Sequence, residues 1–273
     1  MTGEPDLACV AISLRAQPEL AGAVRSVLAQ DEPVEVVVVN SGGGDAGALL
    51  RGLDVRVVEL AERVFPGAAR NAGLAATGAR YVAFLAADCV AEPGWAAARL
   101  RAHRGGADAV ASAMVCRPGA GWVERASLLL LHNRRLPDTP PRRRLLYSLS
   151  YDRTLFDRYG RFCEDLRIGE DTVFNRSFGP EVRVVWGDGV RTAHRFPATM
   201  RALLADQYAR GRRRAAMGDR RPAGLAGRAV LDVGRCARQA LATRDPAERR
   251  ALIAALPLVP AGAAAYAAGA LSA

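Results

Sequence analysis

Three polar residues of this chain have the type and the setting for chemistry on a hydroxyl or a phosphate. Asp88 closely follows the apolar run Tyr81–Ala86, Asp171 ends the tripeptide Gly-Glu-Asp before an apolar segment, and His194 follows another apolar run. Carboxylate oxygens and a neutral imidazole nitrogen can hold a divalent cation. A carboxylate held in one geometry can also accept the proton of an attacking hydroxyl. Residues of these types can therefore bind a metal ion or move a proton.

Each of them also has a simpler interpretation. An aspartate after a strand often serves as a turn residue or a helix cap, and Glu170-Asp171 could merely cap a surface helix. A single histidine such as His194 is often structural. The surrounding elements and motifs have to decide between these interpretations.

The segment 65–95 is predicted to position Asp88. Pro66-Gly67 open a helix over 68–76, and Thr77-Gly78 end it because glycine readily adopts the left-handed conformation. The next apolar run is predicted to be a buried strand. Asp88 therefore lies just past the carboxyl end of that strand, where open α/β sheets bind their ligands.

Strands and helices alternate through the first half of the chain. Strands are expected at Leu7–Leu14, 34–39, 55–60, 108–117 and 181–190, and helices at 18–29, 46–52 and 91–104. This alternation predicts an α/β fold with a mostly parallel central sheet flanked by helices. Late arginines of the helix 91–104, Arg99 among them, are expected to complement its dipole.

The sequence RNAGLAATGARYVAFLAADCVAEPGW resembles the metal-site segment of the family 2 glycosyltransferases, which have the GT-A fold. The matching residues are Arg70, Asn71, Gly73, Gly78, Tyr81, Phe84, Leu85, Asp88, Pro93 and Trp95. The family's D-x-D motif is only half present, because Ala86 stands in place of its first aspartate. The resemblance implies that Asp88 holds a divalent cation and the donor diphosphate.

A second stretch, 151–176, resembles the family's segment that ends in Gly-Glu-Asp. In inverting members the aspartate of that motif is the general base, which implies this role for Asp171, with Glu170 orienting or capping. The resemblance also makes His194 a metal ligand together with Asp88. Imidazole, carboxylate and phosphate oxygens suit Mn²⁺ better than Mg²⁺.

Further positions are implied to bind the nucleotide-sugar donor. Asn40 and Ser41 stand where the family has two acidic residues that help to hold the nucleoside, and an asparagine can hydrogen-bond a base edge. Arg70 is implied to lie near the donor diphosphate or base, because a guanidinium fork suits that group. Arg212, in a Q-Y-x-x-G-R segment, is expected near the diphosphate or a membrane.

The charge and the cysteines limit the partners and the compartment. The 273-residue chain has a net charge of +10, and all 38 of its basic residues are arginine. This favours anionic partners, namely a sugar nucleotide, a phosphorylated acceptor or a membrane surface, whereas no nucleic-acid-binding module is visible. Five scattered cysteines and an N-terminus without a secretory signal predict a cytoplasmic protein with neither a disulfide framework nor a zinc-binding motif.

The chain is expected to divide into a GT-A-like domain at 1–215 and a basic helical extension at 216–273. The arginines at 134, 135 and 142–144 are either a solvated charge run or a docking face for an anionic acceptor or headgroup. The uncharged tail 251–273 is long enough to span a membrane. Its alanines, glycines and prolines favour a half-buried or peripheral segment, packed on its own domain or on the inner membrane face, over a true span.

The combined prediction is a metal-dependent, inverting, hexosyltransferase-like enzyme that moves a sugar from a UDP- or GDP-linked donor to an acceptor hydroxyl. One alternative is a catalytically weakened GT-A protein that binds nucleotide-sugars or acts as a scaffold, motivated by Ala86, Asn40 and Ser41. A sugar-phosphate nucleotidyltransferase is disfavoured, because the segment 14–19 is not the basic, glycine-rich loop that such enzymes carry.

Overall fold

The computed structural model describes residues 5–146, 149–218 and 221–273. The described residues form two compact units, an α/β unit from 1–113 with 146–193 and a helical unit from 114–145 with 194–273. The units differ from the expected division at residue 215. Residues 114–145 and the helix before 216 pack with the C-terminal helices, so tertiary contacts place them there.

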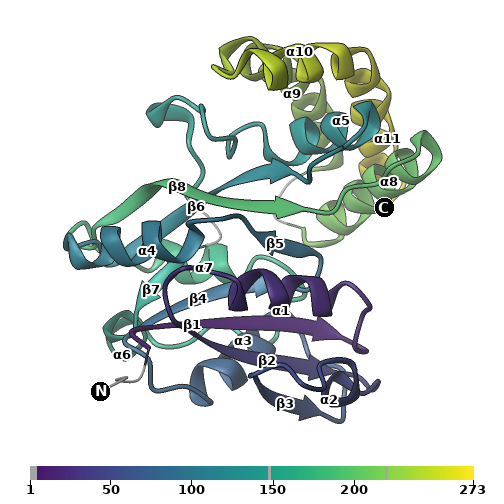
Figure 1. Ribbon diagram of the computed structural model, residues 1–273. Helices are drawn as coiled ribbons and strands as arrows, with labels where there is room; N and C mark the ends of the chain where they lie inside the picture. The colour runs from purple at the N-terminus through teal and green to yellow at the C-terminus, as the bar shows by residue number, and fades with distance from the viewer. Residues whose placement is uncertain (1–4, 147–148, 219–220) are drawn as a thin grey trace. The chain divides into compact units, whose positions relative to one another are not determined.

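One mixed sheet of eight strands has the order β3-β2-β1-β4-β7-β6-β8-β5 (Figure 1). The strands are β1 (Leu7–Leu14), β2 (Val34–Ser41), β3 (Arg56–Leu60), β4 (Tyr81–Ala86), β5 (Cys89–Ala91), β6 (Ala109–Cys116), β7 (Ser150–Asp152) and β8 (Val184–His194). The first four pair in parallel, and β7 pairs antiparallel with both β4 and β6. The expected α/β class is confirmed. The three-residue strands β5 and β7 were not predicted.

In the part of the α/β unit that the structure describes, six helices accompany the strands. They are α1 (Leu20–Leu28), α2 (Ala46–Leu49), α3 (Pro66–Ala75), α4 (Trp95–Arg104), α6 (Thr154–Tyr159) and α7 (Glu170–Arg176). Helix α3 approaches the sheet closely at Gly73, where a Cβ atom would lie 2.2 Å from Val10 Cγ1. A larger residue there would push α3 off the sheet, and Arg70 and Asn71 lie on the same helix.

Aromatic rings fill the core between the sheet and the segment that leads to α7. Phe84 of β4 and Tyr151 of β7 meet Phe156 and Phe162 edge to face, and Phe156 stacks on Phe174 of α7. Such pairs add about 0.5–1.5 kcal/mol each beyond their buried area. The core therefore fixes the start of α7 relative to β4, the strand that precedes Asp88.

The described residues of the helical unit form five helices and two short 3₁₀ segments. They are α5 (Trp122–His132), η1 (Pro141–Arg143), α8 (Met200–Ala216), α9 (Pro222–Ala242), α10 (Pro246–Ala255), η2 (Leu256–Leu258) and α11 (Val259–Leu271). Figure 1 shows α11 running beside α8 and α9. At Gly211 and Gly269 the backbones of α8 and α11 touch, since a Cβ atom at Gly211 would lie 2.0 Å from the Tyr266 carbonyl oxygen.

The apolar tail is helical and partly covered. Among the described residues, one helical stretch, Pro246–Leu271, is long and apolar enough to cross a membrane, with a mean hydropathy of 1.7 over its best window. Of that window, 28% is buried inside the protein. Length and composition alone are weak evidence for a span, so the half-buried or peripheral segment stays a prediction.

The glycine contact between α8 and α11 yields a stability prediction. Gly211→Ala places a methyl group against backbone atoms, and we expect the free energy of unfolding to fall by about 1–3 kcal/mol. Gly234→Ala is the matched control, because no atom lies within 4 Å of a Cβ there. It should stabilise α9 by about 0.5–1 kcal/mol. Urea unfolding of both variants measures the sign of each change in the free energy of unfolding. Equal changes in the two variants would contradict the close packing of α8 against α11.

Candidate functional site

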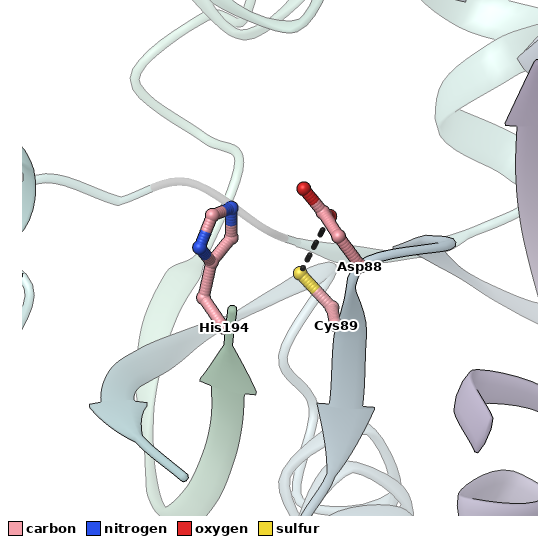
Figure 2. A group of neighbouring side chains, drawn as sticks. All are labelled: Asp88, Cys89 and His194. Carbon is pink, nitrogen blue, oxygen red and sulfur yellow. Dashed lines mark hydrogen bonds between the residues drawn. The ribbon is translucent and has the colours of Figure 1, made fainter. Parts of the chain in front are cut away.

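Asp88, Cys89 and His194 form a group that could hold a metal ion (Figure 2). Their ligand atoms all lie within 4.8 Å of one another, and the Cys89 thiol donates to Asp88 Oδ1 at 3.6 Å. Cys89 begins β5 and His194 ends β8, and these two strands are neighbours in the sheet. Sheet pairing therefore brings together Asp88 and His194, which are far apart in the sequence.

Sequence reasoning missed Cys89. The spacing of the cysteines from one another shows no paired metal-binding motif, so it does not point to Cys89. The useful signal was instead a thiol directly after a predicted metal ligand. Carboxylate and imidazole are ligands of divalent cations, and the thiol is a softer donor beside them. The donor set thus fits a divalent cation.

Aromatic rings surround the histidine. The Phe196 ring centroid lies 4.7 Å from that of His194, and the His132 ring stands edge-on at 5.9 Å. Burial lowers the pKa of His132 well below its ordinary value, so that ring stays neutral at physiological pH. A neutral neighbour does not repel a cation bound at His194.

Asp171 lies at the start of α7 beside an ion pair. Arg70 Nη1 contacts Glu170 Oε1 at 2.8 Å, and its guanidinium lies 5.6 Å from the ring centroid of Phe84, near the end of β4. Asp171 Oδ1 accepts the Thr172 N–H at 2.7 Å, which fixes its carboxylate at the first turn of the helix. Arg70 therefore connects the start of α7 to the strand that precedes Asp88.

Glu170 is buried, with 5% of its surface exposed. Burial raises the pKa of Glu170, and Arg70 opposes that rise. The orienting role expected of Glu170 stays a prediction. Arg70, expected to bind the donor, has its guanidinium engaged by Glu170, so its donor contact stays a prediction.

The asparagine of the R-N motif has a tethering role that the sequence did not indicate. Asn71 Nδ2 donates to the Phe162 carbonyl at 2.9 Å and to Glu164 Oε1 at 2.8 Å, and its Oδ1 accepts the Phe162 N–H at 3.1 Å. At Gly67 a Cβ atom would lie 2.0 Å from the Cys163 carbonyl oxygen. Helix α3 thus holds the segment that leads to the predicted general base.

Asn40 organises two loops at the carboxyl ends of β1 and β2. Its fully buried side chain accepts the Ala16 N–H at 2.8 Å and donates to Gly43 O at 3.1 Å and to Glu59 Oε2 at 2.7 Å. Ala16 and the preceding Arg15 have left-handed φ angles of 46° and 58°, which cost about 1–2 kcal/mol each. Asn40 therefore helps to hold a strained loop.

The amide of Asn40 is engaged within the protein, and Ser41 beside it is buried. Base recognition by these two residues stays a prediction. Arg212 is an exposed residue of α8 in the helical unit. Its predicted contact with a diphosphate or membrane also stays a prediction.

Comparison with known proteins decides the family. The family model described as glycosyl transferase family 2 matches residues 9–169, more than half of the chain. The chain belongs to this family. The predicted resemblance is confirmed. A search among curated proteins finds no match.

Solved glycosyltransferases share the fold at low sequence identity. The mannosyltransferase PcManGT from Pyrobaculum calidifontis, in complex with GDP-Man and Mn²⁺, has a TM-score of 0.57 and 20% identity, over 100% of this chain and 77% of that one. TarS 1–349 from S. aureus has a TM-score of 0.51 and 21% identity, over 74% of this chain and 64% of that one. This chain thus spans less than two thirds of TarS 1–349. The GT-A-like α/β fold is confirmed.

The Arg70–Glu170 pair leads to a coupled prediction for the stability of this family 2 member. Arg70→Met leaves Glu170 buried without its charge partner and should cost about 2–3 kcal/mol, less than a fully buried pair because Arg70 is partly exposed. Because burial raises the pKa of Glu170, the loss should grow as the pH rises through that pKa and shrink in acid. Urea unfolding at several pH values measures the loss.

The double variant Arg70→Met/Glu170→Gln is the control for this pair. Removing both charges should recover most of the stability that Arg70→Met loses. Strictly additive costs of the two substitutions would show that the pair is not coupled.

Proposed function

We propose that this family 2 member is a metal-dependent, inverting, hexosyltransferase-like enzyme that moves a sugar from a UDP- or GDP-linked donor to an acceptor hydroxyl. The observation that carries the proposal is the convergence of Asp88 and His194, with Cys89, within 4.8 Å. Related folds bound to UDP-GlcNAc and to GDP-Man with Mn²⁺ support a nucleotide-sugar donor and a divalent cation. Mn²⁺ is proposed over Mg²⁺ because of the imidazole donor.

Each residue of the site has a defined task in this proposal. Asp88, His194 and Cys89 would hold the cation, which when bound offsets the charge that develops on the nucleoside diphosphate leaving group. Asp171 accepts the proton of the acceptor hydroxyl as that oxygen attacks the anomeric carbon from the face opposite the leaving group. Glu170 and Arg70 hold the first turn of α7 in place, so that Asp171 keeps one orientation.

The acceptor is proposed to be an anionic or lipid-linked hydroxyl compound, and the protein is proposed to act in the cytoplasm or at the inner face of a membrane. The charge of +10 and the apolar tail support this assignment.

Ala86 supports a second candidate function. It replaces the first aspartate of the family's motif, so the protein could bind nucleotide-sugars without turning them over. The three ligand atoms that remain favour the enzyme, because Asp88 can ligate a cation directly.

Donor turnover tests the proposal. The purified protein is incubated with UDP- and GDP-linked hexoses, and release of the nucleoside diphosphate is measured with Mn²⁺, with Mg²⁺ and with EDTA. We expect release with Mn²⁺, less with Mg²⁺ and none with EDTA. Donor binding by calorimetry without any turnover would favour the binding protein, and metal-independent turnover would refute the cation's role.

A further inference from the structure

A pocket of about 270 Å³ in the helical unit has a strongly cationic lining. The lining residues are Asn133, Arg134, Arg142, Arg143, Arg235, Arg238 and Gln239. Five of these carry a guanidinium group and none carries a carboxylate. They come from the residues after α5, from η1 and from α9. Tertiary packing thus adds α9 arginines to the basic segment that the sequence showed at 134–144.

Most of this positive charge has no ionic partner among the residues that the structure describes. Asp232 pairs with Arg235 at 2.6 Å. Within the described part of the chain, none of the other four arginines lies at ion-pair distance from a carboxylate. Like charges around one cavity repel each other, so the arrangement is most stable with an anion inside.

Gln239 provides an independent sign of a ligand. The residue is only 2% exposed, and its Nε2 finds no hydrogen-bond partner among the described residues. Buried polar groups in folded proteins are almost always hydrogen-bonded, so an unpartnered donor at a pocket wall calls for an acceptor. An oxyanion would accept from this amide and from the arginines together.

We propose that this pocket binds the phosphoryl group of an anionic ligand. Guanidinium forks match phosphate oxygens in pairs, which is why arginine predominates at such sites. The volume equals that of roughly nine waters at about 30 Å³ each, which accommodates a phosphate or diphosphate while the rest of a larger ligand extends outward. The proposal does not rest on the proposed transferase activity.

The phosphoryl group could be carried by a lipid or by a soluble compound. Leu231 and Leu241 of α9 are 62% and 63% exposed. Their spacing from Arg235 and Arg238 puts all four residues on one side of the helix. Exposed leucines beside arginines are typical of helices that lie in a membrane interface, so the vesicle arm of the test examines that source.

Calorimetric titration with sodium pyrophosphate tests the pocket. The full chain is used in EDTA, so that no metal ion recruits pyrophosphate elsewhere. Arg142→Gln/Arg143→Gln should weaken binding at least about tenfold, because it removes two charge-assisted contacts. Arg228→Gln is the matched control, an exposed arginine of α9 outside the pocket lining, and it should change binding less than about twofold. Circular dichroism confirms that each variant is folded.

Gln239→Met separates a binding role from a structural one. It removes the unpartnered buried amide while keeping a similar length and helix propensity. We expect the melting temperature to rise, because the desolvation cost of an unsatisfied donor disappears, while pyrophosphate binding weakens. A purely structural role of Gln239 would instead lower the melting temperature and leave binding unchanged, against the proposal.

The source of the phosphoryl group is tested by co-flotation with phosphatidic acid vesicles and with phosphatidylcholine vesicles. Binding to phosphatidic acid vesicles that needs Arg142 and Arg143, and that falls with Leu231→Gln/Leu241→Gln, identifies a lipid. Pyrophosphate binding without flotation identifies a soluble ligand. The proposal is overturned if neither probe binds, or if Arg228→Gln weakens binding as much as the pocket variant does.

Discussion

Asp171→Asn is expected to lower sugar transfer by about 10²–10⁴-fold, the range that a positioned general base contributes. The amide keeps the size of the side chain, and its oxygen can still accept the Thr172 N–H at the first turn of α7, so the helix start should persist. What disappears is the ability to take a proton at pH 7. Initial rates of acceptor glycosylation at saturating donor measure the loss.

The pattern of the kinetic loss identifies the role of Asp171. The donor Kd should stay within about threefold of wild type, because the proton is taken only as the acceptor attacks. Asp157→Asn, at an exposed aspartate of α6, is the matched control and should leave kcat unchanged. If Asp171→Asn kept full kcat, or lost transfer only through weaker donor binding, the general-base assignment would be wrong.

Asp88→Asn is expected to abolish Mn²⁺ binding and, with it, metal-dependent transfer. Outer-shell substitutions at metal sites cost about 10–100-fold in affinity, so the loss of a direct carboxylate ligand should exceed that range. His194→Ala should have a similar effect, because both side chains belong to the same group of ligand atoms. Mn²⁺ titration followed by electron paramagnetic resonance measures the affinity without any activity assay.

Cys89→Ser provides a graded comparison at the same site. Exchanging a thiol for a hydroxyl removes the soft donor and should move the metal preference toward Mg²⁺. Asp54→Asn, at an exposed aspartate before β3, controls for a loss of negative charge elsewhere. Wild-type Mn²⁺ affinity in Asp88→Asn would show that the cluster does not hold the cation, while the family assignment would stand.

Local sequence patterns explain why part of this site could be predicted from the sequence. Runs such as the valines of β2 and the stretch Tyr81–Ala86 are apolar enough to be buried, and their periodicity is local information. The position of Asp88 after a buried strand followed from this pattern. The Gly-Glu-Asp at the start of α7 was equally visible, because helix starts have local signals.

Which side chains meet across neighbouring strands could not be predicted in the same way. Strands β8 and β5 lie at one end of the sheet order, and this pairing places the Cys89 thiol near His194. The expected interpretation of Arg99 as a helix-dipole partner was wrong. Arg99 is fully buried and donates to the Val110 carbonyl and to Ser150 Oγ, and burial lowers its pKa to about 9.

The sequence by itself determined the fold class, the family and the two acidic motifs, because these depend on local periodicity and on contiguous residues. Only the tertiary structure decided which side chains meet. It engaged Arg70 with Glu170, placed Asn40 between two loops, and brought the α9 arginines beside those at 142–143. The physical reason is that burial and charge pairing depend on distances through space, which residue spacing along the chain does not specify.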